Sequence, residues 1–108
     1  MAGGNVLVTG GAGYIGSHAC KALAGAGFVP VTYDNLSTGH GWAVQWGPLE
    51  VGDVLDGDRL GGVMDRYRPV AVMHFAALSL VGESMQQPEK YYTNNVAGSL
   101  SIVRAMLI

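Results

Sequence analysis

Apolar residues in the first third of the chain follow two different spacings. Residues 5–9 are a short run of apolar β-formers, which predicts a buried strand. From Ile15 onward, apolar residues recur at helical spacing until Gly27, a residue type that commonly ends helices. Residues 28–33 form a second β-rich run, so the pattern predicts strand, helix and strand in succession.

The remaining elements are also bounded by recognisable signals. A third strand is predicted at 49–52, and Asp56 is well placed to cap a helix that ends before Pro69. Residues 70–77 are apolar on both faces, as central parallel strands are. Pro88 suits a first helical position, and an apolar stripe continues from there to the end of the chain.

The order of these elements is β-α-β-β-α-β-α. Alternating strands and helices favour a parallel sheet with right-handed crossovers, hence a Rossmann-type, doubly wound α/β fold. Such sheets bind ligands beyond the carboxyl ends of their strands. Glycine-rich or polar segments follow each of the predicted strands, so we expect the chemistry at that edge.

Composition narrows the classes of partner. Hydrophobic residues make up 49% of the chain and charged residues 13%, which suits one compact domain with buried strands. The formal net charge is −2 and no basic run is present, so a nucleic-acid partner is not expected. No segment approaches the roughly 18 apolar residues of a membrane span, and a single cysteine, Cys20, fits a reducing cytoplasm.

The candidate chemistry begins with the glycines of "VLVTGGAGYIGSH", residues 6–18. Gly10 would allow a tight turn after the first strand, Gly13 close approach of the backbone to a pyrophosphate, and Gly16 close packing of the helix. Asp34 ends the second strand and would accept hydrogen bonds from the adenosine ribose while repelling a 2′-phosphate. These features predict a dinucleotide site that prefers NAD to NADP. The alternative is that the glycines only serve turns and Asp34 only ends a strand.

Three segments carry a family resemblance. "TGGAGYIG" resembles the extended short-chain dehydrogenase/reductase family, and "DNLSTGH", directly after the second strand, is similar to the UDP-glucose 4-epimerases within it. Residues 74–100, "HFAALSLVGESMQQPEKYYTNNVAGSL", are similar to the same family throughout. The resemblance implies that residues 1–108 are the N-terminal part of an NAD-binding Rossmann domain, truncated before its later strands and without a substrate domain.

The resemblance also implies roles for individual residues. Backbone amides of Tyr14 and Ile15 would contact the pyrophosphate, residues 34–39 would surround the adenosine, and Asp53 would accept from the adenine amine. From the residues alone, the alternatives are that Asp53 is a loop residue near the third strand and that Asn94 is an ordinary polar position. The full set of expected cofactor-binding residues is Gly10, Gly13, Tyr14, Ile15, Gly16, Asp34, Asn35, Leu36, Ser37, Thr38, Gly39, Asp53, Val54, Phe75, Ala76, Ala77, Leu78, Ser79 and Asn94.

The sequence departs from the family at one of these positions and lacks the family's catalytic pair. Ser79 stands where the family commonly has a lysine, and a hydroxyl does not replace that positive charge. The family's base is a tyrosine with a lysine four residues later, and no Tyr-x-x-x-Lys occurs here. We therefore expect no catalytic residue in this chain, and no activity from it alone. His18, His40 and Cys20 show no metal-ligand spacing, so no metal site is expected.

The resemblance implies an activity for the parent protein. That activity would interconvert UDP-glucose and UDP-galactose through a transient 4-keto sugar, in a cytoplasmic homodimer. One alternative is another NAD-dependent nucleotide-sugar epimerase, or a dehydratase. An alternative of a different class is a noncatalytic dinucleotide-binding or redox-sensing module.

Overall fold

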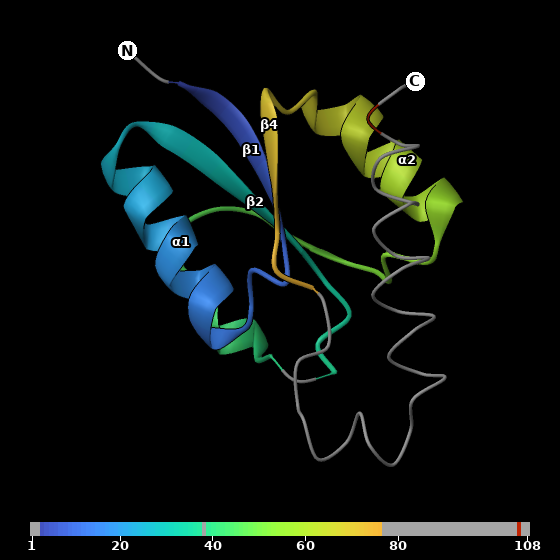
Figure 1. The fold of residues 1–108 in the computed structure, drawn as a ribbon, viewed down its shortest axis with the longest axis horizontal. Helices are drawn as coiled ribbons and strands as arrows, with labels where there is room; N and C mark the ends of the chain where they lie inside the picture. The colour runs from blue at the N-terminus through green and yellow to red at the C-terminus, as the bar shows by residue number, and fades with distance from the viewer. Residues whose placement is uncertain (1–2, 38, 77–105, 107–108) are drawn as a thin grey trace.

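The computed structural model describes residues 3–37, 39–76 and 106 (Figure 1). The elements in chain order are β1 (Gly4–Thr9), α1 (Tyr14–Gly25), β2 (Phe28–Asp34), the 3₁₀ turn η1 (Gly41–Ala43), β3 (Leu49–Val51), α2 (Gly57–Tyr67) and β4 (Ala71–His74). This order confirms the sequence prediction as far as the fourth strand.

The strands form one parallel sheet in the order β3-β2-β1-β4. Thr9, the last residue of β1, lies opposite Tyr33 of β2 and His74 of β4. The carboxyl ends of these three strands therefore meet at one edge, where the α/β arrangement places ligand sites. The α/β fold class is confirmed.

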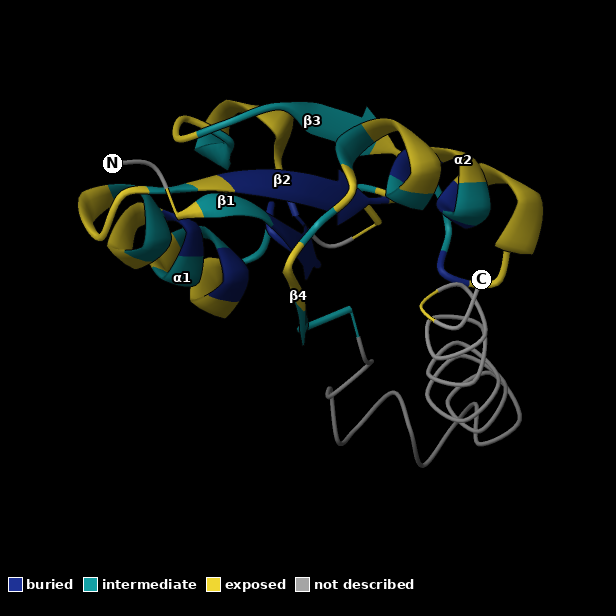
Figure 2. Cartoon of the chain, turned by 90° about the horizontal axis from the view of Figure 1, so that it is seen from above, coloured by how far each residue is buried: buried dark blue, intermediate teal, exposed yellow. Residues whose placement is uncertain are grey.

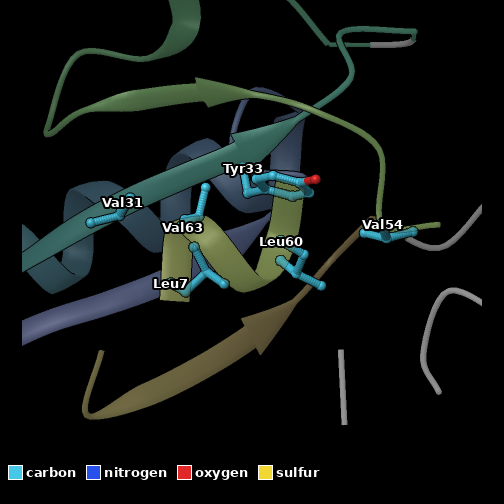
Figure 3. Packing of buried hydrophobic residues seen from close by; sticks show 6 residues of the cluster. All are labelled: Leu7, Val31, Tyr33, Val54, Leu60 and Val63. Atoms are coloured by element: carbon cyan, nitrogen blue, oxygen red, sulfur yellow. The ribbon is translucent and has the colours of Figure 1, made fainter. Parts of the chain in front are cut away.

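Helices α1 and α2 cover opposite faces of the sheet, because side chains alternate between the faces along each strand (Figures 1 and 2). On one face, β1 and β2 pack against α2, as Figure 3 shows. This cluster consists of Leu7, Val31, Tyr33, Val54, Leu60 and Val63. On the other face, Val6 and Val8 pack against Cys20 of α1. Burial on both faces explains why the central residues of β1 and β2 are mostly apolar rather than alternately polar.

Local signals set the ends of α2. The Asp56 side chain accepts a hydrogen bond from the Arg59 N–H at 3.1 Å, which confirms the predicted N-cap. Arg68 closes the helix in the left-handed conformation, with φ of 47°. Pro69 disfavours helical backbone at the residue before it, so the helix stops where the sequence indicated.

The fourth strand is shorter than predicted. The sequence indicated residues 70–77, whereas β4 spans Ala71–His74. The reason is that β1 ends at Thr9 and Gly10 turns away, so none of the described strands continues the ladder beyond His74. The last predicted helix lies outside the described residues. Within the described part of the chain, neither α1 nor α2 is long and apolar enough to cross a bilayer.

Candidate functional site

Gly10 turns the chain from β1 into the glycine-rich segment at the carboxyl edge. Its φ is +72°, a conformation that favours glycine, and its N–H donates to the Tyr33 carbonyl at 2.9 Å. A Cβ at this position would lie 2.6 Å from the backbone carbonyl carbon of Phe75. Both the conformation and the lack of space require glycine here, which confirms the predicted tight turn.

Gly16 brings the first turn of α1 against that glycine turn. A Cβ on Gly16 would meet the Gly10 carbonyl, 2.8 Å from its carbon, and would lie 2.9 Å from the Cα of Gly11. These neighbours are backbone atoms, so no side-chain rotation could relieve the clash. The predicted close packing of α1 at Gly16 is confirmed.

The N-terminus of α1 lies at the same edge, and its own first turn supplies neither a side-chain cap nor an acidic group. Gly13 is the N-cap residue and supplies no side-chain hydrogen bond, and no acidic residue lies in the first turn. The side chains of Tyr14 and Ile15 are 81% and 66% exposed. Because a helix N-terminus carries partial positive charge, this arrangement suits an anionic ligand such as a phosphate.

Asp34 lies at the end of β2, beside the glycine turn. It is 8% exposed, and its two carboxylate oxygens accept different backbone hydrogen bonds. Oδ2 accepts from the Ala12 N–H at 3.0 Å and Oδ1 from the Leu36 N–H at 2.7 Å. Each oxygen keeps a second lone pair, so a ribose hydroxyl remains a possible donor. The carboxylate thus joins the glycine turn to the loop after β2, a role that the sequence did not reveal.

The loop after β2 folds back toward the glycine turn. Leu36 has a left-handed φ of 62°, and the Ser37 N–H donates to the Asn35 side-chain oxygen at 2.9 Å. Further on, the His40 N–H donates to the carbonyl of Ala12 at 3.2 Å. Ala12, a residue of the glycine turn, is only 2% exposed where this loop packs against it.

Asp53 lies next to Asn35 although the two are distant in sequence. The Asn35 side-chain N–H donates to Oδ2 of Asp53 at 3.3 Å, and the Leu55 N–H donates to Oδ1 at 2.9 Å. The backbone carbonyl of Asp53 accepts from the Tyr33 hydroxyl at 2.7 Å. Burial, followed by the charge of Asp56, raises the pKa of Tyr33 to about 12, so this hydroxyl stays protonated and holds Asp53 in place.

Val54 differs from its neighbours in the predicted set. Its side chain is 5% exposed and packs in the α2-side core with Leu60. Any contact between Val54 and a ligand would therefore use its backbone.

The end of β4 joins the site through Thr9. The Thr9 hydroxyl oxygen lies 2.6 Å from His74 Nδ1 and accepts from the Phe75 N–H at 3.1 Å. Burial lowers the pKa of His74, which favours the neutral imidazole in this strand. These bonds hold Phe75 and Ala76, both half-buried, next to Gly10.

Most predicted cofactor-binding residues lie along this edge. The structure gathers Gly10, Gly13, Tyr14, Ile15, Gly16, Asp34, Asn35, Leu36, Ser37, Gly39, Asp53, Phe75 and Ala76 there. Thr38, Ala77, Leu78, Ser79 and Asn94 lie outside the described residues. Sequence reasoning missed Thr9, Ala12 and Tyr33. Ala12 could have been suspected, since it is a small residue inside the glycine motif, but the hydrogen bonds of Thr9 and Tyr33 depend on strand register.

Away from this edge, the described residues form a hollow but no metal site. No group of three or more His, Cys, Asp or Glu residues among those described could hold a metal ion. An open hollow of about 440 Å³ lies at the opposite end of the sheet, where α2 ends and β4 begins. Its lining includes Met64, Arg68, Val70 and Val72, none of which belongs to the predicted set.

Comparison with known proteins gives consistent matches. The model of the NAD dependent epimerase/dehydratase family matches residues 6–108. A UDP-glucose 4-epimerase of Rhizobium meliloti (strain 1021) is 53% identical over 107 residues, covering 99% of this chain and 33% of the relative. The chain therefore spans about a third of the length of such relatives.

Solved structures agree with this match. The UDP-glucose 4-epimerase from Brucella ovis in complex with NAD is 60% identical, with a TM-score of 0.92 over 94% of this chain and 31% of its own. The enzyme from Stenotrophomonas maltophila, with bound NAD and formylated UDP-arabinopyranose, is 39% identical, with a TM-score of 0.92 over 96% and 33%. With a family model that covers nearly all of its residues, this chain belongs to the NAD dependent epimerase/dehydratase family.

Proposed function

We propose that this chain is the NAD-binding region of a UDP-glucose 4-epimerase. The observation that carries the proposal is the junction of β1 and α1, where a left-handed Gly10 and a crowded Gly16 bring an uncapped helix N-terminus beside the Asp34 carboxylate. Relatives that share more than half of the matched residues carry that name, and one was solved with NAD.

The residues at the edge fit the chemical parts of NAD. The pyrophosphate would bind the amides of Tyr14 and Ile15 at the start of α1, since the Gly13 N–H already donates to the Gly10 carbonyl at 3.1 Å. The adenosine ribose would bind Asp34, and the adenine would lie near the Asn35–Asp53 pair. Phe75 and Ala76 would line the dinucleotide where it passes the carboxyl end of β4. When bound, NAD supplies a reversible acceptor for the two electrons of an alcohol oxidation.

Asp34 also supports a preference for NAD over NADP. The carboxylate is nearly buried and is fixed by two backbone N–H groups, so it has little freedom to move away from a ligand. A 2′-phosphate on the ribose would bring negative charge against this fixed carboxylate. Such like-charge contact is a common means of rejecting a close analogue.

Calorimetric titration of the chain with NAD and with NADP tests the proposal. We expect NAD to bind at least about tenfold more tightly than NADP, equivalent to roughly 1.4 kcal/mol of discrimination. Equal affinity for the two dinucleotides, or no binding of NAD by the folded chain, would contradict it.

Under this proposal, the epimerase activity would reside in a full-length protein that contains this chain as its NAD-binding region. The protein would convert UDP-galactose to UDP-glucose without net accumulation of NADH, because the sugar is oxidised and then reduced again. Steady accumulation of NADH would indicate a dehydrogenase instead. Binding of NAD without conversion of any sugar nucleotide would favour a noncatalytic sensor. We propose a homodimer in the cytoplasm, as the resemblance implies; the single free cysteine fits that compartment.

A second candidate is an epimerase or dehydratase for another sugar nucleotide. The Stenotrophomonas maltophila structure, which contains formylated UDP-arabinopyranose, supports keeping this candidate. Comparing kcat/KM for UDP-galactose with that for a UDP-pentose distinguishes the two, since the preferred substrate has the higher ratio.

A further inference from the structure

Ala12 connects the two loops that flank the candidate dinucleotide site. Its N–H donates to Oδ2 of Asp34 at 3.0 Å, and its carbonyl accepts from the His40 N–H at 3.2 Å. One peptide segment of the glycine turn is therefore bonded both to the end of β2 and to the loop that follows it. We call the contacts among Ala12, Asp34, Gly39 and His40 the Ala12 junction.

Gly39 allows this junction to close. It is buried, and a Cβ added to it would lie 2.7 Å from both the carbonyl carbon and the carbonyl oxygen of Ala12. Its φ lies outside the left-handed region, so glycine is needed here for space and not for backbone conformation. Since the crowded atoms are backbone, a methyl group would push the loop away from the glycine turn.

The other side of the junction contains a strained residue. Leu36 has a backbone φ of 62°, which residues other than glycine rarely adopt. Its N–H donates to Oδ1 of Asp34 at 2.7 Å. Strained backbone persists where neighbouring contacts determine it. The Asp34 carboxylate therefore holds the glycine turn through one oxygen and the strained loop through the other.

We propose that Gly39 and Ala12 are positioning residues that lock the loop after β2 onto the glycine turn before any ligand binds. These contacts fix the Asp34 carboxylate, which would bind the ribose, beside the amides at the start of α1, which would bind the pyrophosphate. The consequence for ligand affinity rests on the proposed function, whereas the contact between the two loops does not.

Paired glycine substitutions test this proposal. Gly39→Ala adds a methyl group against Ala12, while Gly41→Ala adds the same group in the same loop, where nothing lies within 4 Å. Three quantities are measured on the chain: NAD affinity by calorimetry, and the amide hydrogen exchange of His40 and of Leu60 by NMR. The Leu60 N–H of α2, which donates to the carbonyl of the N-cap residue Asp56 at 3.0 Å, lies away from the junction and reports stability there.

We expect Gly39→Ala to weaken NAD binding and to speed exchange at His40 by about tenfold each, the effect of losing one or two hydrogen bonds. Exchange at Leu60 should stay within about twofold in the same variant, and Gly41→Ala should leave all three quantities within that range. Unchanged exchange at His40 in folded Gly39→Ala would overturn the proposal. Equal acceleration at His40 and Leu60 would also overturn it, because it would indicate general destabilisation.

A second variant keeps the test decisive if Gly39→Ala does not fold. In Asp34→Asn, one of the two backbone N–H groups loses its acceptor, so exchange at His40 should again rise relative to Leu60. A protected His40 in this variant would overturn the proposal. If the unaltered chain binds no NAD, the proposed function fails, and the exchange results alone decide whether the two loops are locked.

Discussion

At the scale of single residues, the glycines of the site differ in why they are glycine. Gly10 needs both a left-handed φ and space, whereas Gly16 and Gly39 need only space. Gly25, at the end of α1, has no neighbour within 4 Å of where a Cβ would lie. The same substitution should therefore have opposite effects at the two ends of one helix.

Replacing Gly16 with alanine should lower the free energy of unfolding by about 1–3 kcal/mol, because the methyl group would force the helix away from backbone atoms of Gly10. Gly25→Ala is the matched control and should leave the free energy of unfolding unchanged or raise it by up to about 1 kcal/mol. Urea unfolding followed by circular dichroism measures both. Equal effects of the two substitutions would show that α1 does not pack closely at Gly16.

At the scale of elements, α2 depends on contacts at its first turn and along its β3 side. Asp56 caps its N-terminus, and Glu50 of β3 accepts from the Tyr67 hydroxyl at 2.6 Å and pairs with Arg59 at 2.7 Å. The Glu50 side chain is 12% exposed, whereas that of Arg59 is 40% exposed, so the carboxylate is largely covered while its cationic partner reaches water. The cluster fixes α2 beside β3, next to the segment that contains Asp53.

Asp56→Ala should destabilise the chain by about 1 kcal/mol, since the Arg59 N–H loses its acceptor. Asp56→Asn removes the same charge but keeps a side-chain oxygen in place, so it should cost only a few tenths of that amount. Thermal unfolding of both variants checks the difference. If the two variants lose the same stability, charge and not capping explains the role of Asp56.

Glu50 should make the stability of the fold sensitive to acid. Hydrogen bonds from Tyr67 and then Arg59 lower the pKa of Glu50 below its ordinary value of 4.5. Between the two pKa values the unfolded chain binds the proton and the folded chain does not, so stability falls as the pH falls from 4.5 through the folded pKa. The stabilising contribution is complete above that window.

Glu50→Gln should flatten this part of the pH dependence and cost about 1–2 kcal/mol near neutral pH. Asp65→Asn removes a charge from an ion pair that is 81% exposed on both sides, and should change the free energy of unfolding by less than about 0.5 kcal/mol. Urea unfolding between pH 3 and pH 7 measures the slopes. An unchanged acid slope in Glu50→Gln would contradict the assignment.

The elements were more predictable from sequence than the contacts among them. The spacing of apolar residues predicted β1, α1, β2, α2 and their order, because an element that is buried on one or two faces has apolar residues at regular intervals. No such spacing predicts the left-handed φ of Leu36, because this conformation depends on a hydrogen bond to the Asp34 carboxylate.

The site was predictable to the same extent. The glycine spacing and Asp34 gave its core, because they are local in sequence. Three other features depend on which segments become neighbours across the sheet. They are the burial of Ala12, the hydrogen bond between Asn35 and Asp53, and the short β4. No local pattern carries that information.

At the scale of the whole molecule, β4 lies at an edge of the sheet that the described residues form. Among the described residues it pairs only with β1, and Val70, just before it, is 66% exposed. Unpaired strand edges with apolar side chains promote association between chains. We therefore expect the 108-residue chain, expressed alone, to self-associate.

Sedimentation velocity tests this expectation. Val70→Lys places a charge beside the exposed edge and should shift the chain toward monomer. Val29→Lys adds the same charge to β2, where Val29 is 39% exposed and separated from β4 by β1, and should leave the association unchanged. A monodisperse monomer of the unaltered chain would refute the expectation.

Mapping the backbone amide shifts of the chain during titration with NAD tests the central claim most directly, because it locates the ligand. The site described here predicts that the largest shifts fall on Gly13, Tyr14, Ile15 and Leu36, at the carboxyl edge of the sheet. Met64 and Arg68, which line the hollow at the opposite end, should not move. Shifts centred on that hollow, or no shifts at millimolar NAD, would contradict the assignment of this edge as an NAD site.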